Sequence, residues 1–242
     1  MVASGYLPTI EQWVKERCAP LWWHDPRVPS GTRPIKGATV CFVNTGKRLL
    51  GITAAHVHLE CASILKRDPG IACQLGAHTF DPDRYLLAID EHWDLAVYGL
   101  SEMQVNATRA RIHHAPEWPP VVADGDGYVI GGWVWSLSED WGNKATHYFL
   151  HFIAGLKSRS EYQLGIVTGT STSVPWGNNP LPSGTNLGGM SGGPVYRVSE
   201  SAGLVKIMLV GIVFEYQPSF EIAFARPLSL IDEQGSLHPR MF

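Results

Sequence analysis

The chain lacks the features of several large classes of protein. Its longest apolar run, residues 207–214, is far shorter than the roughly 20 residues that a membrane-spanning helix needs. It has only 19 basic residues against 22 acidic ones, and the basic residues form no stripe that could follow a phosphate backbone. We therefore expect neither a membrane nor a nucleic acid as a partner.

Two further absences concern the compartment and metal binding. Residues 1–8 have neither the basic segment nor the apolar stretch of a secretory signal, which favours a cytoplasmic protein. The cysteines at positions 18, 41, 61 and 73 show no C-x-x-C spacing, so the sequence has no zinc-ribbon or redox motif. Buried free thiols and no metal site are the expectation.

Short strand patterns separated by turns are abundant instead. The chain has 25 glycines, 17 prolines and 45% hydrophobic residues against 17% charged ones, a composition typical of a folded, β-rich chain. Strand patterns recur before residue 101 and again after residue 127, with a polar, proline-bearing segment between them. Within the first set, the sequence predicts one helical turn at 54–59 and a short strand at 63–65. The sequence predicts a short helix and an extended arm over residues 1–36, then strand-rich units over 37–115 and 116–242.

Residues 188–194, with the sequence GGMSGGP, place one serine among four glycines. Glycine reaches positive φ at little cost, so this run favours a backbone folded tightly around the exposed hydroxyl of Ser191. An ordinary surface loop would have the same composition. The residues upstream of the run decide between these two interpretations.

A histidine and an aspartate precede Ser191 in the sequence, the first at the end of a strand pattern and the second at the start of one. His56 closes the run GITAAH, and Asp94 begins the apolar strand pattern DLAV. A serine hydroxyl needs a base to take its proton, and that base needs a carboxylate to fix its tautomer. The sequence therefore predicts Ser191 as nucleophile, His56 as base and Asp94 as its partner, with the amides of Gly189 and Ser191 as oxyanion donors.

These motifs, in this order, resemble the trypsin/chymotrypsin-like serine peptidases. The matching segments are TAAH at 53–56, DLAV at 94–97, GMSGGP at 189–194 and VGIV at 210–213, so the resemblance spans roughly residues 37–230. It implies an all-β fold of two antiparallel β-barrels with the site in the cleft between them. It also implies a serine endopeptidase that cuts protein or peptide substrates through an acyl-enzyme and needs no metal or organic cofactor.

The same resemblance places substrate-binding residues at Thr185, Phe214, Glu215 and Tyr216. Thr185 takes the floor position of the primary pocket, where it offers no charge to hold arginine or lysine. The residue before the cut is therefore expected to be uncharged and small to medium in size, although Glu215 would favour a basic group nearby.

Two departures from the family pattern concern activation and disulfides. Met190 stands where cleavage-activated relatives have an aspartate, so we expect no N-terminal processing, and control by a regulatory protein partner or by the N-terminal arm. Val57 fills a position where secreted relatives have a cysteine. Cys41 would then find Cys61 as a substitute partner in an oxidising setting.

Two alternatives stay open at the level of sequence. A catalytically silent member of the same fold would serve as a peptide-binding module. The serine motif also fits the nucleophile elbow of an α/β-hydrolase-type esterase, with Asp232 and His238 as later partners. An elbow leads directly into a helix, whereas residues 194–198 have a strand pattern, so the esterase is the weaker alternative.

Overall fold

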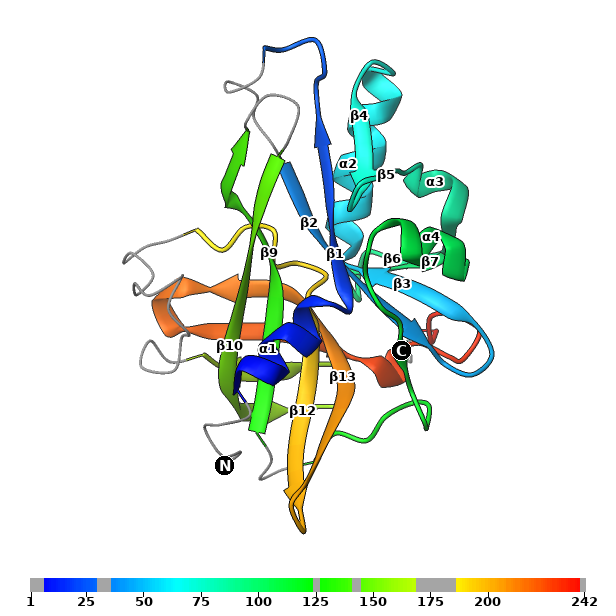
Figure 1. Ribbon diagram of the computed structural model, residues 1–242. Helices are drawn as coiled ribbons and strands as arrows, with labels where there is room; N and C mark the ends of the chain where they lie inside the picture. The colour runs from blue at the N-terminus through cyan, green and yellow to red at the C-terminus, as the bar shows by residue number, and fades with distance from the viewer. Residues whose placement is uncertain (1–6, 30–35, 124–126, 141–144, 169–185, 240–242) are drawn as a thin grey trace.

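The strands form two sheets, the first within residues 18–114 and the second within residues 127–227, as the computed structural model in Figure 1 shows. The structure describes residues 7–29, 36–123, 127–140, 145–168 and 186–239. The predicted all-β fold class is confirmed, since both sheets are antiparallel apart from one short parallel pair. The helices in the described residues are few and short compared with these sheets.

The first sheet consists of β1 (Cys18–His24), β2 (Lys36–Asn44), β3 (Leu49–Thr53), β4 (Ala72–Leu75), β5 (His78–Thr79), β6 (Leu86–Asp90), β7 (Leu95–Gly99) and β8 (His113–His114). Its order is β5-β4-β1-β2-β3-β7-β6, and β8 pairs with β2 in parallel. Among the described residues, no strand pairing joins β5 to β6. The hydrogen-bonded path of this sheet therefore has two ends.

The second sheet consists of β9 (Gly127–Asp140), β10 (Ala145–Arg159), β11 (Leu164–Val167), β12 (Pro194–Ser201), β13 (Leu204–Gln217) and β14 (Ile222–Pro227). These strands close into a barrel in the order β10-β11-β14-β13-β12-β9. The strand that follows Ser191 is thus an antiparallel barrel strand. Its place between β9 and β13 contradicts the esterase alternative, which needs a helix there.

A shared apolar cluster holds the two sheets against each other. Cys41, Ile52 and Val97 of the first sheet and Val129 and Ile212 of the second are all buried in it. Burial of apolar surface is the main favourable term in folding and has no preferred direction. Here it packs Ile52 of β3 and Val97 of β7, the strands next to His56 and Asp94, against Val129 and Ile212 of the second sheet.

The helices are α1 (Leu7–Lys15), α2 (Ala55–Arg67), α3 (Pro82–Tyr85) and α4 (Glu102–Ala107), with 3-10 turns η2 (Pro218–Phe220) and η3 (Leu228–Leu230). The sequence predicted one helical turn at 54–59 and a strand at 63–65, and this was wrong. α2 runs for 13 residues and buries Ala55, His58, Cys61 and Ala62 on one side. That spacing of three and four residues is helical and continues through the expected strand.

The N-terminal segment also differs from the prediction of an extended arm. Residues 18–24 form β1, which lies inside the first sheet between β2 and β4. Leu21 and Trp23 are buried there, and Nε1 of Trp22 donates to the carbonyl oxygen of Gly76 at 2.8 Å. Pro20 lies within this strand, and because proline is uncommon inside sheets the sequence did not predict a strand there.

The limits proposed for the two strand-rich units stay a prediction.

The cysteines are free and buried, but their neighbours differ from those expected. Sγ of Cys61 lies 3.2 Å from Sγ of Cys73, whereas Cys41 belongs to the cluster between the sheets. The proposed pairing of Cys41 with Cys61 therefore does not match the fold.

In the described part of the chain, no helix has the length and apolar character needed to cross a membrane.

His113 is a buried titratable group at the junction of α1 with the sheets. Its ring packs edge-on against Trp13 at 5.5 Å and against Tyr196 at 5.6 Å between ring centroids. Burial, together with the charge of Arg17, lowers the pKa of His113 from 6.5 to about 4. The folded protein therefore holds this imidazole neutral in a pH range where the unfolded chain protonates it.

We predict that acidification destabilises the fold through His113. Its folded pKa lies below its unfolded pKa, so the stability it contributes is complete above pH 6.5 and declines toward pH 4. By pH 5 this loss is about 2 kcal/mol for one such histidine. Urea unfolding at pH 7 and pH 5 should show a smaller loss in His113→Gln than in the wild type. Equal losses in the two proteins would contradict the prediction.

Candidate functional site

His56 occupies the first turn of α2, directly after β3. Its backbone N–H donates to Oδ1 of Asp94 at 2.9 Å, and its Nδ1 lies 2.8 Å from Oδ2 of the same residue. The residue before the helix, Ala54, has no side chain that could cap the helix. Asp94 therefore supplies the cap from the turn between β6 and β7 and contacts the imidazole with the same carboxylate.

The geometry at Asp94 favours its ionised form. Burial raises the pKa of this carboxyl, but the two hydrogen bonds from His56 and the charge of Arg226 outweigh burial and leave the pKa below its ordinary value. An ionised carboxylate only accepts hydrogen bonds, so Nδ1 of His56 carries the proton. Nε2 of the neutral ring is then the acceptor, which is the tautomer that a general base needs.

Asp94 lies between β6 and β7 with a φ of 51°, in the left-handed region that residues other than glycine adopt at a cost. The aspartates that precede it in the chain have other partners. Asp90 accepts the backbone N–H groups of His92 and Trp93 in the preceding turn, at 2.8 and 3.0 Å. Asp81 caps α3, and Asp83 contacts Lys66 at 3.0 Å. Of these four aspartates, Asp94 alone contacts His56 in the described residues.

The loop around Ser191 is held through its carbonyl groups. Four consecutive carbonyls accept hydrogen bonds: Gly188 from Trp135 N–H at 3.1 Å, Gly189 from Thr39 Oγ1 at 2.9 Å, Met190 from Gly193 N–H at 2.8 Å and Ser191 from Thr39 N–H at 2.9 Å. The N–H and C=O groups of one trans peptide point in opposite directions. The amides of Gly189 and Ser191 therefore point away from these anchors.

The neighbouring amides of the loop already have partners. Those of Met190, Gly192 and Gly193 donate to the carbonyls of Leu187, Val213 and Met190, at 3.2, 2.7 and 2.8 Å. In the part of the chain that the structure describes, the amides of Gly189 and Ser191 donate no hydrogen bond. They are the two that the sequence predicted as oxyanion donors.

Thr39 of β2 is the residue that sequence reasoning missed. It is fully buried, and each of its polar groups is used. Besides its two bonds to the serine loop, its Oγ1 accepts the N–H of Trp133 at 2.8 Å and its carbonyl accepts Thr53 Oγ1 at 2.8 Å. No sequence motif marks such a residue, because its partners are mostly backbone groups roughly 100 to 150 positions away.

The loop's shape requires glycine at two positions. Gly189 and Gly192 have φ values of +104° and +84°, in the region that side chains disfavour. A Cβ on Gly192 would lie 1.9 Å from the carbonyl oxygen of Thr39, and one on Gly189 would lie 2.4 Å from that of Trp133. The close approach of the loop to β2 of the first sheet thus depends on Gly192, and its close approach to β9 of the second sheet depends on Gly189.

A hollow of about 510 Å³ adjoins the His56–Asp94 pair. Its other lining residues are Ala55, Leu59, Glu91, His92, Phe214, Glu215 and Arg226. Two predicted substrate-binding residues, Phe214 and Glu215, are therefore beside the pair. Tyr216 is half-buried on β13 and does not line this hollow, and Thr185 lies outside the described residues.

The hydroxyl of Ser191 points to β13. Its Oγ donates to the carbonyl oxygen of Phe214 at 3.4 Å. Within the described residues, no hydrogen bond joins Ser191 to His56. The structure thus brings His56 and Asp94 into direct contact and connects Ser191 to the hollow beside them through Phe214. The same residues include no cluster of three or more side chains able to hold a metal ion.

No family model and no curated protein sequence matches the chain. Solved structures similar to it include the Rv3671c protease from M. tuberculosis in its active form, with 14% identity, a TM-score of 0.46 and coverage of 93% of this chain and 82% of that one. A thermostable serine protease, AL20, from an extremophilic microorganism has 12% identity, a TM-score of 0.46 and coverage of 88% and 91%.

A third similar structure concerns the coupled folding and binding of the intrinsically disordered Sesbania mosaic virus VPg protein. Its identity is 11% and its TM-score 0.47, with coverage of 88% of this chain and 85% of that one. All three identities are far below 25%. The activity of this chain therefore has to be argued from its own residues.

We predict that the Thr39 hydroxyl is needed to hold the serine loop. Thr39→Val keeps the shape but leaves the Gly189 carbonyl and the Trp133 amide without a partner, which should lower the free energy of unfolding by about 2 kcal/mol. Thr39→Ser keeps the hydroxyl and loses one methyl group, at about 1 kcal/mol. Chemical denaturation compares the two variants. A valine variant more stable than the serine variant would contradict the role of the hydroxyl.

Proposed function

We propose that the chain is a serine endopeptidase that hydrolyses peptide bonds through an acyl-enzyme. Ser191 attacks the scissile carbonyl carbon, and Nε2 of His56 accepts the hydroxyl proton and then returns it to the leaving amine. Asp94 holds His56 in the required tautomer and stabilises the imidazolium. The amides of Gly189 and Ser191 bind the oxyanion.

The observation that carries this proposal is the orientation of the loop around Ser191. Its carbonyls accept hydrogen bonds from Trp135, from Thr39 and from Gly193 of the loop itself, whereas the amides of Gly189 and Ser191 donate to no group among the described residues. Preorganised donors of this kind stabilise a developing charge without reorganising during the reaction. The proposed base is His56, which together with Asp94 lines the hollow that Phe214 and Glu215 also line.

One movement is needed before the reaction. The Ser191 hydroxyl donates to the Phe214 carbonyl and has to turn about its Cα–Cβ bond toward His56. Hydrogen bonds of catalytic groups are often long or absent in free enzymes and form once substrate is bound. The Phe214 carbonyl would then be released to accept an N–H group of the substrate chain.

The proposed substrate is a protein or peptide cut after an uncharged residue of small to medium size. Phe214, Glu215, Tyr216 and Thr185 are the proposed contacts of that residue and its neighbours. The chemistry proceeds without a metal or organic cofactor. A regulatory protein partner and a cytoplasmic location remain part of the proposal.

A second candidate is a peptide-binding module that has lost catalysis. The observation in its favour is the hydrogen bond of Ser191 with Phe214, since a hydroxyl that stays there cannot transfer its proton to His56. The two candidates differ in whether Ser191 reacts with an electrophile. The esterase alternative has no support in the strand that follows Ser191.

We predict that a fluorophosphonate probe labels Ser191. Labelling requires an activated hydroxyl, so Ser191→Ala should remove it, and Asp94→Asn should slow it about 10⁴-fold because the wrong tautomer then faces the serine. Mass spectrometry of the labelled peptide identifies the serine, and Ser160→Ala, outside the proposed site, serves as the matched control. A wild-type protein that stays unlabelled under conditions that label trypsin would favour the binding module.

The wild type and Ser191→Ala also test the proposed substrate. A peptide library treated with the wild type and with Ser191→Ala gives a map of cuts that depend on the serine. Cuts after uncharged, small to medium residues are expected. A map dominated by cuts after arginine or lysine would contradict the proposed pocket without affecting the proposed nucleophile.

A further inference from the structure

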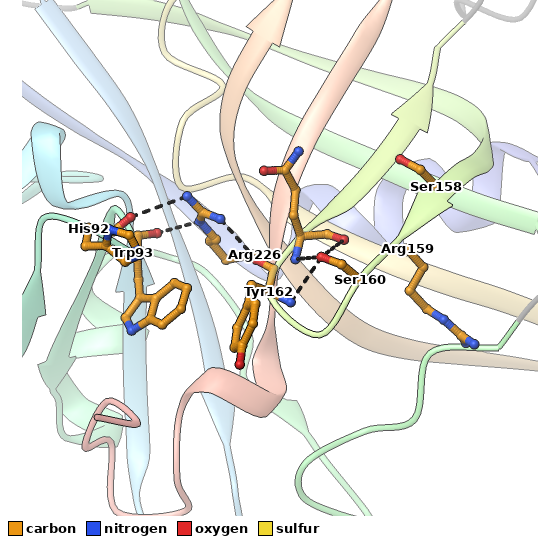
Figure 2. Close-up of a pocket in the computed structure, with 8 residues that line it drawn as sticks. His92, Trp93, Ser158, Arg159, Ser160, Tyr162 and Arg226 are labelled. Atoms are coloured by element: carbon orange, nitrogen blue, oxygen red, sulfur yellow. Dashed lines mark hydrogen bonds between the residues drawn. The ribbon is translucent and has the colours of Figure 1, made fainter. Parts of the chain in front are cut away.

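We propose that Arg226 is a positioning residue for Asp94, because it fixes the backbone that leads into this aspartate from across the junction of the two sheets. The inference rests on the proposed function. Arg226 belongs to β14 of the second sheet, and Asp94 precedes β7 of the first. The half-buried arginine lines both the hollow beside His56 and a second hollow shown in Figure 2.

The hydrogen bonds of Arg226 go to backbone carbonyls. Nε donates to Trp93 at 2.7 Å, Nη1 to Tyr162 at 3.0 Å and Nη2 to His92 at 3.5 Å (Figure 2). His92 and Trp93 immediately precede Asp94. The carbonyl of Trp93 shares a peptide plane with the amide of Asp94, so the bond from Nε fixes the plane from which Asp94 starts.

Asp94 needs this support because its backbone is in an unfavourable region. A non-glycine residue at a φ of 51° is held by its surroundings or relaxes. The carboxylate serves the proposed site only while both oxygens face His56, one toward its backbone N–H and the other toward Nδ1. A change in the Trp93–Asp94 peptide plane would swing the carboxylate away from both donors.

Packing holds the guanidinium itself in place. Its carbon lies 4.1 Å from the centre of the Phe214 ring, in the range of a cation–π contact. The ring of Trp93, whose centre lies 5.9 Å from the same carbon, stacks on that of Tyr162, with centroids 4.9 Å apart and planes at 23°. Arg226 thus contacts both Phe214, whose carbonyl accepts the Ser191 hydroxyl, and Trp93, which directly precedes Asp94.

The choice of arginine follows from its shape. A planar guanidinium donates in several fixed directions at once and can hold carbonyls of residues 92, 93 and 162 together. A lysine ammonium is a point charge on a flexible stem and cannot hold the same three groups in one plane. Burial lowers the pKa of Arg226, an effect that the charges of Asp94 and Glu215 partly offset.

The test measures the tautomer of His56, which does not require activity. In protein labelled with ¹⁵N-histidine, two-bond ¹H–¹⁵N spectra at about pH 8 report which ring nitrogen carries the proton in the neutral form. His56→Ala assigns the signals. The wild type should show Nδ1–H alone, and Arg226→Met should move both nitrogen signals toward each other as the second tautomer appears.

The labelling rate of Ser191 is the second readout. Arg226→Met should lower it about 10- to 100-fold, the scale of a misplacement near 1 Å. Arg226→Lys should change both readouts in the same direction. The matched control is Arg159→Met, because Arg159 lines the second hollow and points away from Arg226 (Figure 2). Its Nη1 donates to the carbonyl of Val122 instead. It should leave both readouts unchanged.

Several results would overturn the inference. A folded Arg226→Met with the wild-type tautomer and labelling rate would do so, as would a lysine variant identical to the wild type, since charge alone would then suffice. If the methionine variant does not fold, Arg226→Lys decides by the same readouts. A wild-type protein that fails to label refutes the proposed function, whereas the tautomer still decides the role of Arg226.

Discussion

The hydrogen bonds of Thr39 are the interaction on which the rest of the site depends. This residue of the first sheet binds the carbonyls of Gly189 and Ser191 and accepts the N–H of Trp133, so it ties the serine loop and β9 to β2. A loop with two left-handed glycines has many conformations in isolation. The carbonyl anchors select the one that leaves the amides of Gly189 and Ser191 free for a ligand.

A second connection between the two sheets involves Asp94 and Arg226. Asp94 caps α2 and holds His56, which makes one carboxylate responsible for both the position and the tautomer of this imidazole. Arg226 reaches from the second sheet to the residues just before Asp94. Thr39 of the first sheet thus holds the Ser191 loop of the second, and Arg226 of the second sheet holds the residues before Asp94 in the first. The buried apolar cluster keeps the two sheets packed together.

The sequence predicted the parts of this arrangement that depend on local patterns. Alternating apolar residues and turns gave the all-β class, and the motif order placed His56 next to Asp94, which are hydrogen bonded. Their catalytic roles, like that of Ser191, stay predictions. The full length of α2 was missed because residues 63–65 fit a short strand as well as a helix, and tertiary burial decided between the two.

Thr39 and Arg226 could not be found in the same way. Thr39 is separated from Gly189 by 150 positions and Arg226 from Trp93 by 133, and each binds a backbone carbonyl, which carries no side-chain signature. β1 was missed for a related reason, since its place between β2 and β4 follows from pairing with distant strands and outweighs the proline within it. Contacts of this kind become visible only in the folded chain.

We propose that an activated Ser191, the two free amides and the His56–Asp94 pair act on one ligand. A crystal structure with a peptide boronic acid tests this most directly. We predict a bond from boron to Oγ of Ser191, with a boronate oxygen about 3 Å from the amide nitrogens of both Gly189 and Ser191. A boronate that is not bonded to Ser191, or whose oxygens face away from both amides, would contradict the account.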